Sequence, residues 1–274
     1  MPLRTAVIGA GHLGRQHARL HANLAAEGRS QFVAVCDVDD ETARSVSVER
    51  KTDYVSDWRE LIGRVDAVSL AVPTASHCEI ACGLLEAGVH VLVEKPISRT
   101  LEEADRMIHD LDIVQWLVGE EVEVTAIHAV GIAILTNKVD AANARLEFSS
   151  GAVANITASR VGTEKIRKMR FFQPHDYVAI DYTTKRASVS SLAPPSADGG
   201  WPGVHVKNLD VIDMEPLRAE ILAFLEAVRD GLPSPVPGLE GRNALALALR
   251  ALERIQEHAA HPGVSALGKT TNVR

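Results

Sequence analysis

The chain has 274 residues, and 46% of them are hydrophobic, which is enough for a buried core in one large domain or two ordinary ones. Lys and Arg total 29 against 36 Asp and Glu, giving a formal net charge of -7. This balance argues against a nucleic-acid-binding protein and against attraction to anionic membranes. No apolar run reaches the roughly 20 residues that span a bilayer, and no signal-peptide pattern opens the sequence. We therefore expect a cytoplasmic protein without nucleic-acid or membrane partners.

Three cysteines, Cys36, Cys78 and Cys82, are too few for a disulfide framework. Cys78 and Cys82 also lack the neighbouring Cys or His residues of a zinc site. We expect reduced, mostly buried thiols and no bound metal.

In the first hundred residues, short apolar runs alternate with helical patterns. The apolar runs are 5–8, 32–36, 67–72 and 89–93, and the helical patterns are 14–27, a segment from Asp40, and 76–87. Strands separated by helices predict right-handed βαβ units and a parallel sheet. We therefore predict an N-terminal Rossmann domain over residues 1–108.

The pattern changes after about residue 118. Strands are predicted at 121–127, 143–148, 153–159, 168–172 and 177–181, an exposed loop at 193–203, and closing helices at 215–230 and 242–258. Within 143–148, polar and apolar residues alternate with the period of two that is typical of a sheet with unlike faces. Residues 109–274 are thus predicted to form a shortened α/β domain with a mainly antiparallel open sheet. We expect this sheet to support a homo-oligomer, either a dimer or a tetramer.

The glycine-rich segment Gly9-Ala10-Gly11-His12-Leu13-Gly14 lies between the first strand and the first helix. Gly9 permits a tight turn, Gly11 lets a pyrophosphate approach the backbone, and Gly14 allows the helix to pack closely on the strand. The helix N-terminus supplies amide groups and partial positive charge for the phosphates. A turn that only packs a helix is the alternative, but this context predicts a dinucleotide site.

The second strand ends at Asp37, where a carboxylate is expected to meet the adenosine ribose hydroxyls. Val38 follows rather than Arg, so a 2′-phosphate would meet a carboxylate without a cation. The sequence therefore favours NAD over NADP as cofactor.

Glu94-Lys95-Pro96 closes another strand at the sheet edge where ligands of open α/β folds bind. A lysine there can hold a substrate hydroxyl and assist proton transfer. The alternative is a solvated lysine that follows a strand.

Taken together, these motifs resemble the Gfo/Idh/MocA oxidoreductases, the family of glucose-fructose oxidoreductase and inositol dehydrogenase. The carrying residues are 9–14, Asp37, 71–74 with His77, 94–96, Asp105-x3-His109-x2-Asp112 with 116–119, and Glu220-x3-Phe224-x3-Val228-x2-Gly231. The resemblance implies that Lys95 is the catalytic lysine and that Asp105 and His109 form an acid/base pair. It also implies cofactor contacts at His12, Leu13, Pro73, Thr74, His77, Glu94 and Lys95, besides the three glycines and Asp37.

The spacing of the implied acid/base pair makes chemical sense, because residues four apart lie on one helical face. A carboxylate at Asp105 could orient the imidazole of His109, which would take the proton of a sugar hydroxyl. The alternative is that both are exposed polar residues of a surface helix. The implied function is NAD-dependent oxidation of a secondary hydroxyl on a sugar or nucleotide sugar.

The sequence departs from the family pattern between the helix after Glu94-Lys95-Pro96 and the helix that carries His109. Relatives have a further strand and the first part of the second domain there. In this chain the pattern predicts two helices with no segment between them, at 100–105 and 107–112. Such an internal deletion favours a second reading of the function. The chain would then be a catalytically weak or silent NAD-binding or scaffold protein derived from this family.

Basic residues gather in one stretch of this acidic protein, and three of them, Arg160, Lys165 and Arg167, are candidates for binding a substrate diphosphate. A solvated hairpin rim is the alternative. The segments 142–146, 151–160 and 171–174 resemble the branch of the family that contains bacterial UDP-N-acetylglucosamine 3-dehydrogenases. That resemblance implies a sugar-nucleotide substrate with a diphosphate for these cations.

Overall fold

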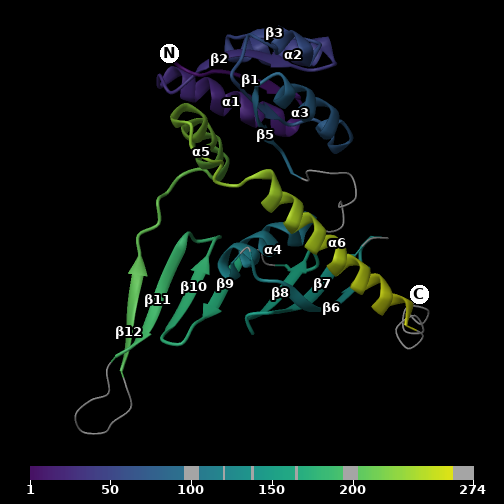
Figure 1. The fold of residues 1–274 in the computed structure, drawn as a ribbon, viewed down its shortest axis with the longest axis vertical. Coiled ribbons are helices and arrows are strands. Elements are labelled where there is room, and N and C mark those ends of the chain that lie inside the picture. The colour runs from purple at the N-terminus through teal and green to yellow at the C-terminus, as the bar shows by residue number, and fades with distance from the viewer. Residues whose placement is uncertain (96–104, 120, 137–138, 164–165, 194–202, 262–274) are drawn as a thin grey trace. The chain divides into compact units, whose positions relative to one another are not determined.

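The structure is a computed structural model that describes residues 1–95, 105–119, 121–136, 139–163, 166–193 and 203–261, with the side chains of 105–109 left out. By its contacts the chain divides into two compact units, Met1–Val161 with Pro216–Arg274, and Gly162–Glu215. Figure 1 shows the chain and labels most of its helices and strands. Across the described ranges, no helix combines the length and apolar character needed to cross a membrane.

The N-terminal layer is a parallel sheet of five strands in the order β3-β2-β1-β4-β5. The strands are β1 (Arg4–Ile8), β2 (Gln31–Cys36), β3 (Asp53–Val55), β4 (Ala67–Leu70) and β5 (His90–Val93). The connecting helices are α1 (His12–Ala26), α2 (Asp40–Arg50) and α3 (His77–Glu86), with short 3-10 turns at Trp58–Leu61 and Thr74–Ser76. The predicted Rossmann topology is confirmed. β3 was not predicted, because its three residues bury only Val55.

The strand order reverses between β1 and β4, which lie side by side although β2 and β3 separate them in the chain. Every residue of β4 is buried, as are four of the five in β1, which is expected for a sheet covered on both faces. In such folds ligands bind in the crevice beyond the carboxyl ends of the strands at the reversal point. The glycine-rich loop and the turn after β4 both start there.

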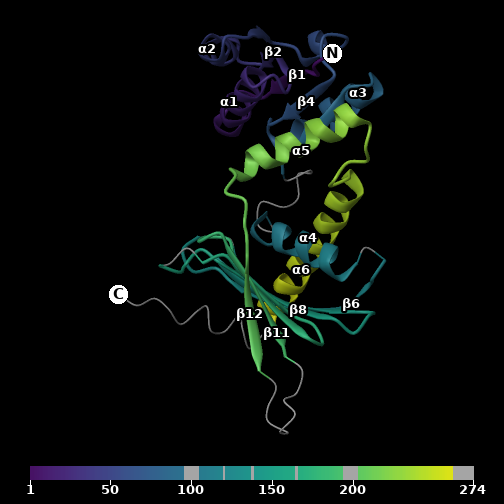
Figure 2. The same cartoon turned by 90° about the vertical axis from the view of Figure 1, so that its left-hand side faces the viewer.

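A segment from late in the chain completes this layer. Helix α5 (Pro216–Asp230) begins with a proline, a residue that suits the first helical position. Its buried Ile221 and Leu225 pack with Leu20 and Leu24 of α1 in one apolar cluster. Figure 2 shows α5 beside α1 and β4. The boundary after residue 108 stays a prediction, and the structure adds α5 to the N-terminal layer.

The rest of the first unit is an antiparallel sheet with two helices on one face. It comprises α4 (Asp105–Val118), β6 (Val124–Ile132), β7 (Ala141–Phe148), β8 (Val153–Ser159) and α6 (Gly238–Ala260). Its core joins Leu111 of α4, Leu146 of β7 and Leu247 of α6. A Cβ on Gly131 would lie 2.8 Å from Ile255, so a glycine lets α6 approach β6.

The second unit is an antiparallel sheet in the order β12-β11-β10-β9. Its strands are β9 (Lys168–Phe172), β10 (Asp176–Asp181), β11 (Arg186–Leu192) and β12 (Val204–Leu209). The antiparallel prediction is confirmed, with the strands divided between two sheets. β11 and β12 were missed, because β11 is rich in serine and every residue of β12 is exposed. The predicted loop at 193–203 lies almost wholly outside the described residues.

The three thiols have different surroundings. Cys36 is buried at the end of β2, and this burial raises the pKa of its thiol to about 12. Cys78 and Cys82 are exposed on α3. The expectation of mostly buried thiols is therefore wrong for two of the three, because both lie on the face of α3 that turns away from the sheet.

Candidate cofactor and catalytic site

Two glycines of the loop after β1 are required by backbone contacts. Gly9 has a φ of 93°, in the region that favours glycine, and a Cβ there would lie 2.4 Å from the carbonyl oxygen of Ala71. A Cβ on Gly14 would lie 1.7 Å from the carbonyl oxygen of Gly9. These contacts bring the loop, the start of α1 and the end of β4 close together.

Gly11 is different, because a Cβ there would meet no heavy atom of the described residues within 4 Å. It is the N-cap of α1, makes no side-chain cap and is followed by no acidic residue in the first turn. His12 and Leu13, the next residues, are exposed. An open glycine at an uncapped helix N-terminus suits a pyrophosphate, which needs backbone amides and close approach. The loop therefore fits a dinucleotide.

Asp37 lies directly after β2 and is hydrogen-bonded to this loop. Its Oδ2 accepts from the backbone N–H of Ala10 at 2.6 Å, and its Oδ1 accepts from the N–H of Asp39 at 3.0 Å. A carboxylate has about four acceptor positions, so Asp37 retains capacity for ribose hydroxyls while its orientation is fixed by the backbone.

The turn after β4 carries the next predicted cofactor residues. Pro73 is exposed and Thr74 half-buried, whereas His77 at the start of α3 is only 2% exposed. The Nε2 atom of His77 lies 2.9 Å from the carbonyl oxygen of Val72. His77 therefore holds the turn that presents Pro73 and Thr74, and its contact with a cofactor stays a prediction.

Glu94 and Lys95 follow β5 at the same edge of the sheet. The backbone N–H of Glu94 donates to the carbonyl of Leu70 at 2.9 Å, which continues the pairing with β4. One carboxylate oxygen, Oε1, lies 2.7 Å from Nε2 of His17 on α1. The other, Oε2, accepts from the backbone N–H of Lys95 at 3.2 Å. The Glu94 side chain thus connects α1 to the predicted catalytic lysine.

Electrostatics around Glu94 favour its ionised form. The hydrogen bond from His17 holds the pKa of Glu94 below its usual range, although burial acts in the opposite direction. Glu220 of α5 behaves differently, because partial removal from water and then the charge of Glu94 raise its pKa. The more easily ionised carboxylate is therefore the one beside Lys95.

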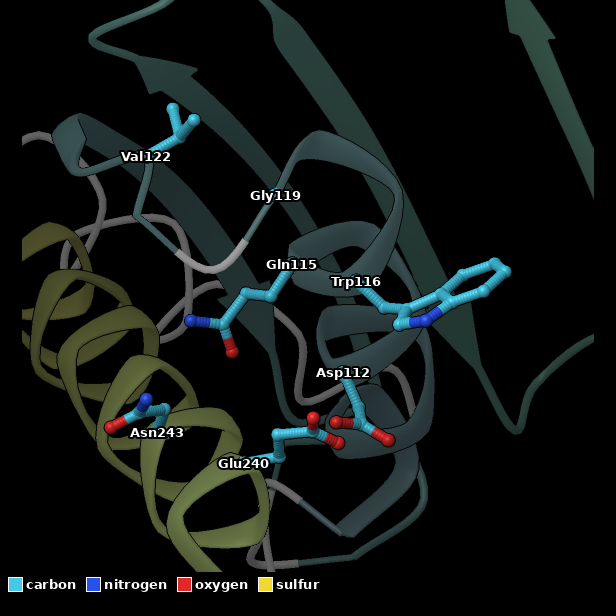
Figure 3. A pocket seen from close by; sticks show the side chains of 7 residues that line it. All are labelled: Asp112, Gln115, Trp116, Gly119, Val122, Glu240 and Asn243. Atoms are coloured by element: carbon cyan, nitrogen blue, oxygen red, sulfur yellow. The ribbon is translucent and has the colours of Figure 1, made fainter. Parts of the chain in front are cut away.

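Asp105 and His109 lie four residues apart in the first turns of α4, as the resemblance required. Their side chains lie outside the described residues, so their pairing stays a prediction. Further along, α4 lines a polar pocket with the start of α6 (Figure 3). The pocket residues are Asp112, Gln115, Trp116, Gly119, Val122, Glu240 and Asn243.

The basic candidates do not form a described cluster. Arg160 lies beside the buried Asp140, with its Nε 3.3 Å from Oδ1. Burial alone would raise the pKa of Asp140, but backbone hydrogen bonds from Thr136, Ile134 and Leu135 hold it well below the usual range. Arg167 belongs to the other unit, with its guanidinium 5.5 Å from the ring centre of Tyr182. Lys165 lies outside the described residues, so the diphosphate site stays a prediction.

Sequence reasoning missed His17, which is 1% exposed. A signal was present, because Gly14, His17, Ala18 and His21 occupy the buried face of α1 at helical spacing. A histidine on such a face needs a polar partner. Only the fold shows that the partner is Glu94, which lies 77 residues away in sequence.

Comparisons with known proteins bear on the family and the fold of this chain. The model of the oxidoreductase family with an NAD-binding Rossmann fold matches residues 3–116, and that of the GFO/IDH/MocA C-terminal domain matches residues 104–172. A UDP-N-acetylglucosamine 3-dehydrogenase from Acidithiobacillus ferrooxidans is 31% identical, with 90% of this chain and 96% of the relative covered. A myo-inositol 2-dehydrogenase from Thermotoga maritima is 24% identical, with 93% and 97% covered.

A solved structure of the UDP-N-acetylglucosamine 3-dehydrogenase of Acidithiobacillus ferrooxidans superposes with a TM-score of 0.83 at 29% identity. It covers 94% of this chain and 99% of that one. The sequence alignment with this enzyme runs over 307 positions, more than the 274 residues here, so the relative carries residues without a counterpart in this chain. The chain belongs to the Gfo/Idh/MocA family of NAD-binding oxidoreductases.

Proposed function

We propose that this protein is an NAD-dependent dehydrogenase that oxidises a secondary hydroxyl of a sugar, with a UDP-N-acetylglucosamine-like nucleotide sugar as the preferred substrate. The observation that carries the proposal is the anchored segment Glu94-Lys95. It lies at the sheet edge that also carries the glycine-rich loop and Asp37. The similarity to a UDP-N-acetylglucosamine 3-dehydrogenase supports the substrate class.

The residues of this chain divide the work as follows. The loop at 9–14 binds the pyrophosphate through backbone amides, and Asp37 accepts hydrogen bonds from the adenosine ribose. When bound, NAD supplies the hydride acceptor. Lys95 holds the substrate hydroxyl, and His109, oriented by Asp105, removes its proton.

This chain lacks residues that the A. ferrooxidans enzyme carries, and we expect the deletion between Glu94-Lys95-Pro96 and His109, the predicted catalytic residues. A deletion there favours slow turnover. Hydride transfer needs the reacting carbon held at roughly 3 to 3.5 Å, and misplacement by about 1 Å costs about a hundredfold in rate. The residues that bind the dinucleotide are all present. We therefore expect normal NAD affinity with turnover below the roughly 1 to 1000 per second of ordinary enzymes.

The missing residues also motivate the second candidate, an NAD-binding protein without catalysis. Titration with NAD, followed by a screen of UDP-sugars and free sugars for formation of reduced nicotinamide, separates the two. The dehydrogenase predicts slow turnover that His109→Ala abolishes while NAD affinity is kept. Tight NAD binding without turnover on any sugar would establish the silent protein and overturn the first proposal.

A further inference from the structure

Two buried histidines lie one turn apart on α1, and only one of them reaches the segment that carries Lys95. His17 is 1% exposed and lies 2.7 Å from Glu94. His21 is fully buried, and its Nε2 lies 2.9 Å from Oγ of Ser69 on β4. The two residues share a helix, a chemical type and a degree of burial, but their side-chain partners differ, Glu94 for His17 and Ser69 for His21.

His17 donates to Glu94 rather than accepting from it. The pKa of Glu94 is lowered, so the carboxylate is ionised near neutral pH and only accepts hydrogen bonds. Nε2 of His17 therefore carries a proton, while its Nδ1 is buried without a hydrogen-bond partner among the described residues. Among the described residues, Glu94 is therefore the only hydrogen-bond partner of this ring.

The carboxylate of Glu94 connects the ring of His17 to the main chain at Lys95. Its Oε1 faces His17, and its Oε2 accepts from the N–H of Lys95. Hydrogen bonds to an ionised group are stronger than neutral ones, and partial burial strengthens the contact between His17 and Glu94 further. With His17 in place the Glu94 side chain has a fixed direction. Without it, the carboxylate would turn toward water and release the Lys95 amide.

We propose that His17 is a positioning residue that fixes the Lys95 backbone through the carboxylate of Glu94. Because α1 also begins at the dinucleotide loop, one rigid helix then sets both the cofactor phosphates and the lysine. The structural part of this inference stands by itself, and its consequence for turnover rests on the proposed dehydrogenase function.

Three variants test the link in the full-length protein. His17→Leu removes the donor and keeps an apolar side chain of similar size. His17→Gln keeps an N–H donor near the position of Nε2. His21→Leu is the matched control, since it removes an equally buried histidine from the same helix without touching Glu94. Thermal unfolding shows which variants are folded, and if His17→Leu is not, Glu94→Ala removes the acceptor of the same contact.

Amide hydrogen exchange at Lys95 measures the link without any substrate. We expect exchange about tenfold faster in His17→Leu, as for the loss of one hydrogen bond, and near-native exchange in His17→Gln and His21→Leu. If the parent protein oxidises a sugar, kcat should fall about a hundredfold in His17→Leu. NAD affinity and the kcat of His21→Leu should stay near the parent values.

The outcomes separate this inference from the proposed function. Equal Lys95 exchange in His17→Leu and His21→Leu would overturn the inference, whatever the enzyme does. A parent protein without turnover would overturn the dehydrogenase, while faster exchange in His17→Leu alone would still support the link. Faster exchange without loss of kcat in an active enzyme would show that His17 does not position Lys95 for catalysis.

Discussion

The cofactor half and the predicted substrate half of this protein hold their polar residues in different ways. In the Rossmann layer, Asp37 and Glu94 directly follow strands and bind backbone amides of the same sheet edge. In the antiparallel regions, Arg160 pairs with the buried Asp140, and Arg167 lies against Tyr182 in a separate unit. Parallel strands have their carboxyl ends at the same edge of the sheet, so the residues that follow them lie around one crevice. The residues that follow antiparallel strands lie at two opposite edges. The first arrangement is readable from the sequence, and the second is not.

The largest effect on stability and NAD binding is expected from a substitution at the closest backbone contact of the glycine-rich loop. Gly14→Ala would place a Cβ 1.7 Å from the carbonyl oxygen of Gly9, and backbone must move to relieve the clash. We expect a loss of stability on the order of 3 kcal/mol and loss of measurable NAD binding. Thermal unfolding and NAD titration check both.

Gly11→Ala is the matched control for Gly14→Ala, because a methyl group there meets no atom within 4 Å in the part of the chain that the structure describes. It should leave thermal stability near that of the parent and still weaken NAD, since the methyl group occupies the approach of the pyrophosphate. Equal stability losses in the two variants would contradict the division between a packing glycine and a binding glycine.

The sequence predicted the Rossmann layer well because its signals are local. Apolar strands, helical periodicity and a glycine-rich turn all act within a few residues, and they place residues 9–14 and Asp37 correctly at the ends of β1 and β2. Serine-rich β11 and the fully exposed β12 carry no such signal. Their strand character comes from pairing with a neighbour, which composition does not reveal.

The same distinction applies to the candidate site. Lys95 was predicted as a site residue because it follows a strand in a motif of the resembled family, and that role stays a prediction. The contact between His17 and Glu94 joins two residues 77 positions apart in sequence. Arg160 was a candidate because it adds charge to a basic stretch, and its ion pair with Asp140 depends on a carboxylate buried by the fold. Residue type and spacing therefore predict which groups are present, and tertiary contacts decide which of them are engaged.

Arg160 and Arg167, the two arginines of the predicted diphosphate site, allow a test of the predicted substrate half. If Arg167 binds a diphosphate, Arg167→Ala should weaken a UDP-sugar by about tenfold or more, because hydrogen bonds between charged groups contribute roughly 1.5 to 3 kcal/mol. NAD affinity and thermal stability should not change. Calorimetric titration with UDP and UDP-N-acetylglucosamine measures the change.

Arg160→Ala should differ from Arg167→Ala in stability, because it leaves the buried carboxylate of Asp140 without its cation. The folded state keeps the pKa of Asp140 low, so the stability from this group is present above its unfolded pKa and is lost as the pH falls. The hydrogen bonds from Thr136, Ile134 and Leu135 that lower this pKa remain in Arg160→Ala, so the variant should lower the thermal midpoint at neutral pH and keep this loss at acidic pH. Unchanged UDP-sugar affinity in both variants would show that neither arginine binds the diphosphate and that both have structural or solvated roles.

The smallest effect concerns the choice between NAD and NADP. Asp37 is held by the Ala10 amide, and its remaining acceptor positions are available to the ribose. Of the next acidic residues, Asp39 is the N-cap of α2 and Asp40 is its first residue. A 2′-phosphate would meet this negative charge, so NAD should bind at least about tenfold tighter than NADP, which is about 1.4 kcal/mol. Asp37→Asn keeps an oxygen for the Ala10 amide and removes the charge, and it should bring the two affinities closer, mainly by improving NADP. Fluorescence titration of both cofactors decides, since equal affinities in the parent protein, or a ratio that Asp37→Asn leaves unchanged, would show that Asp37 does not select the cofactor.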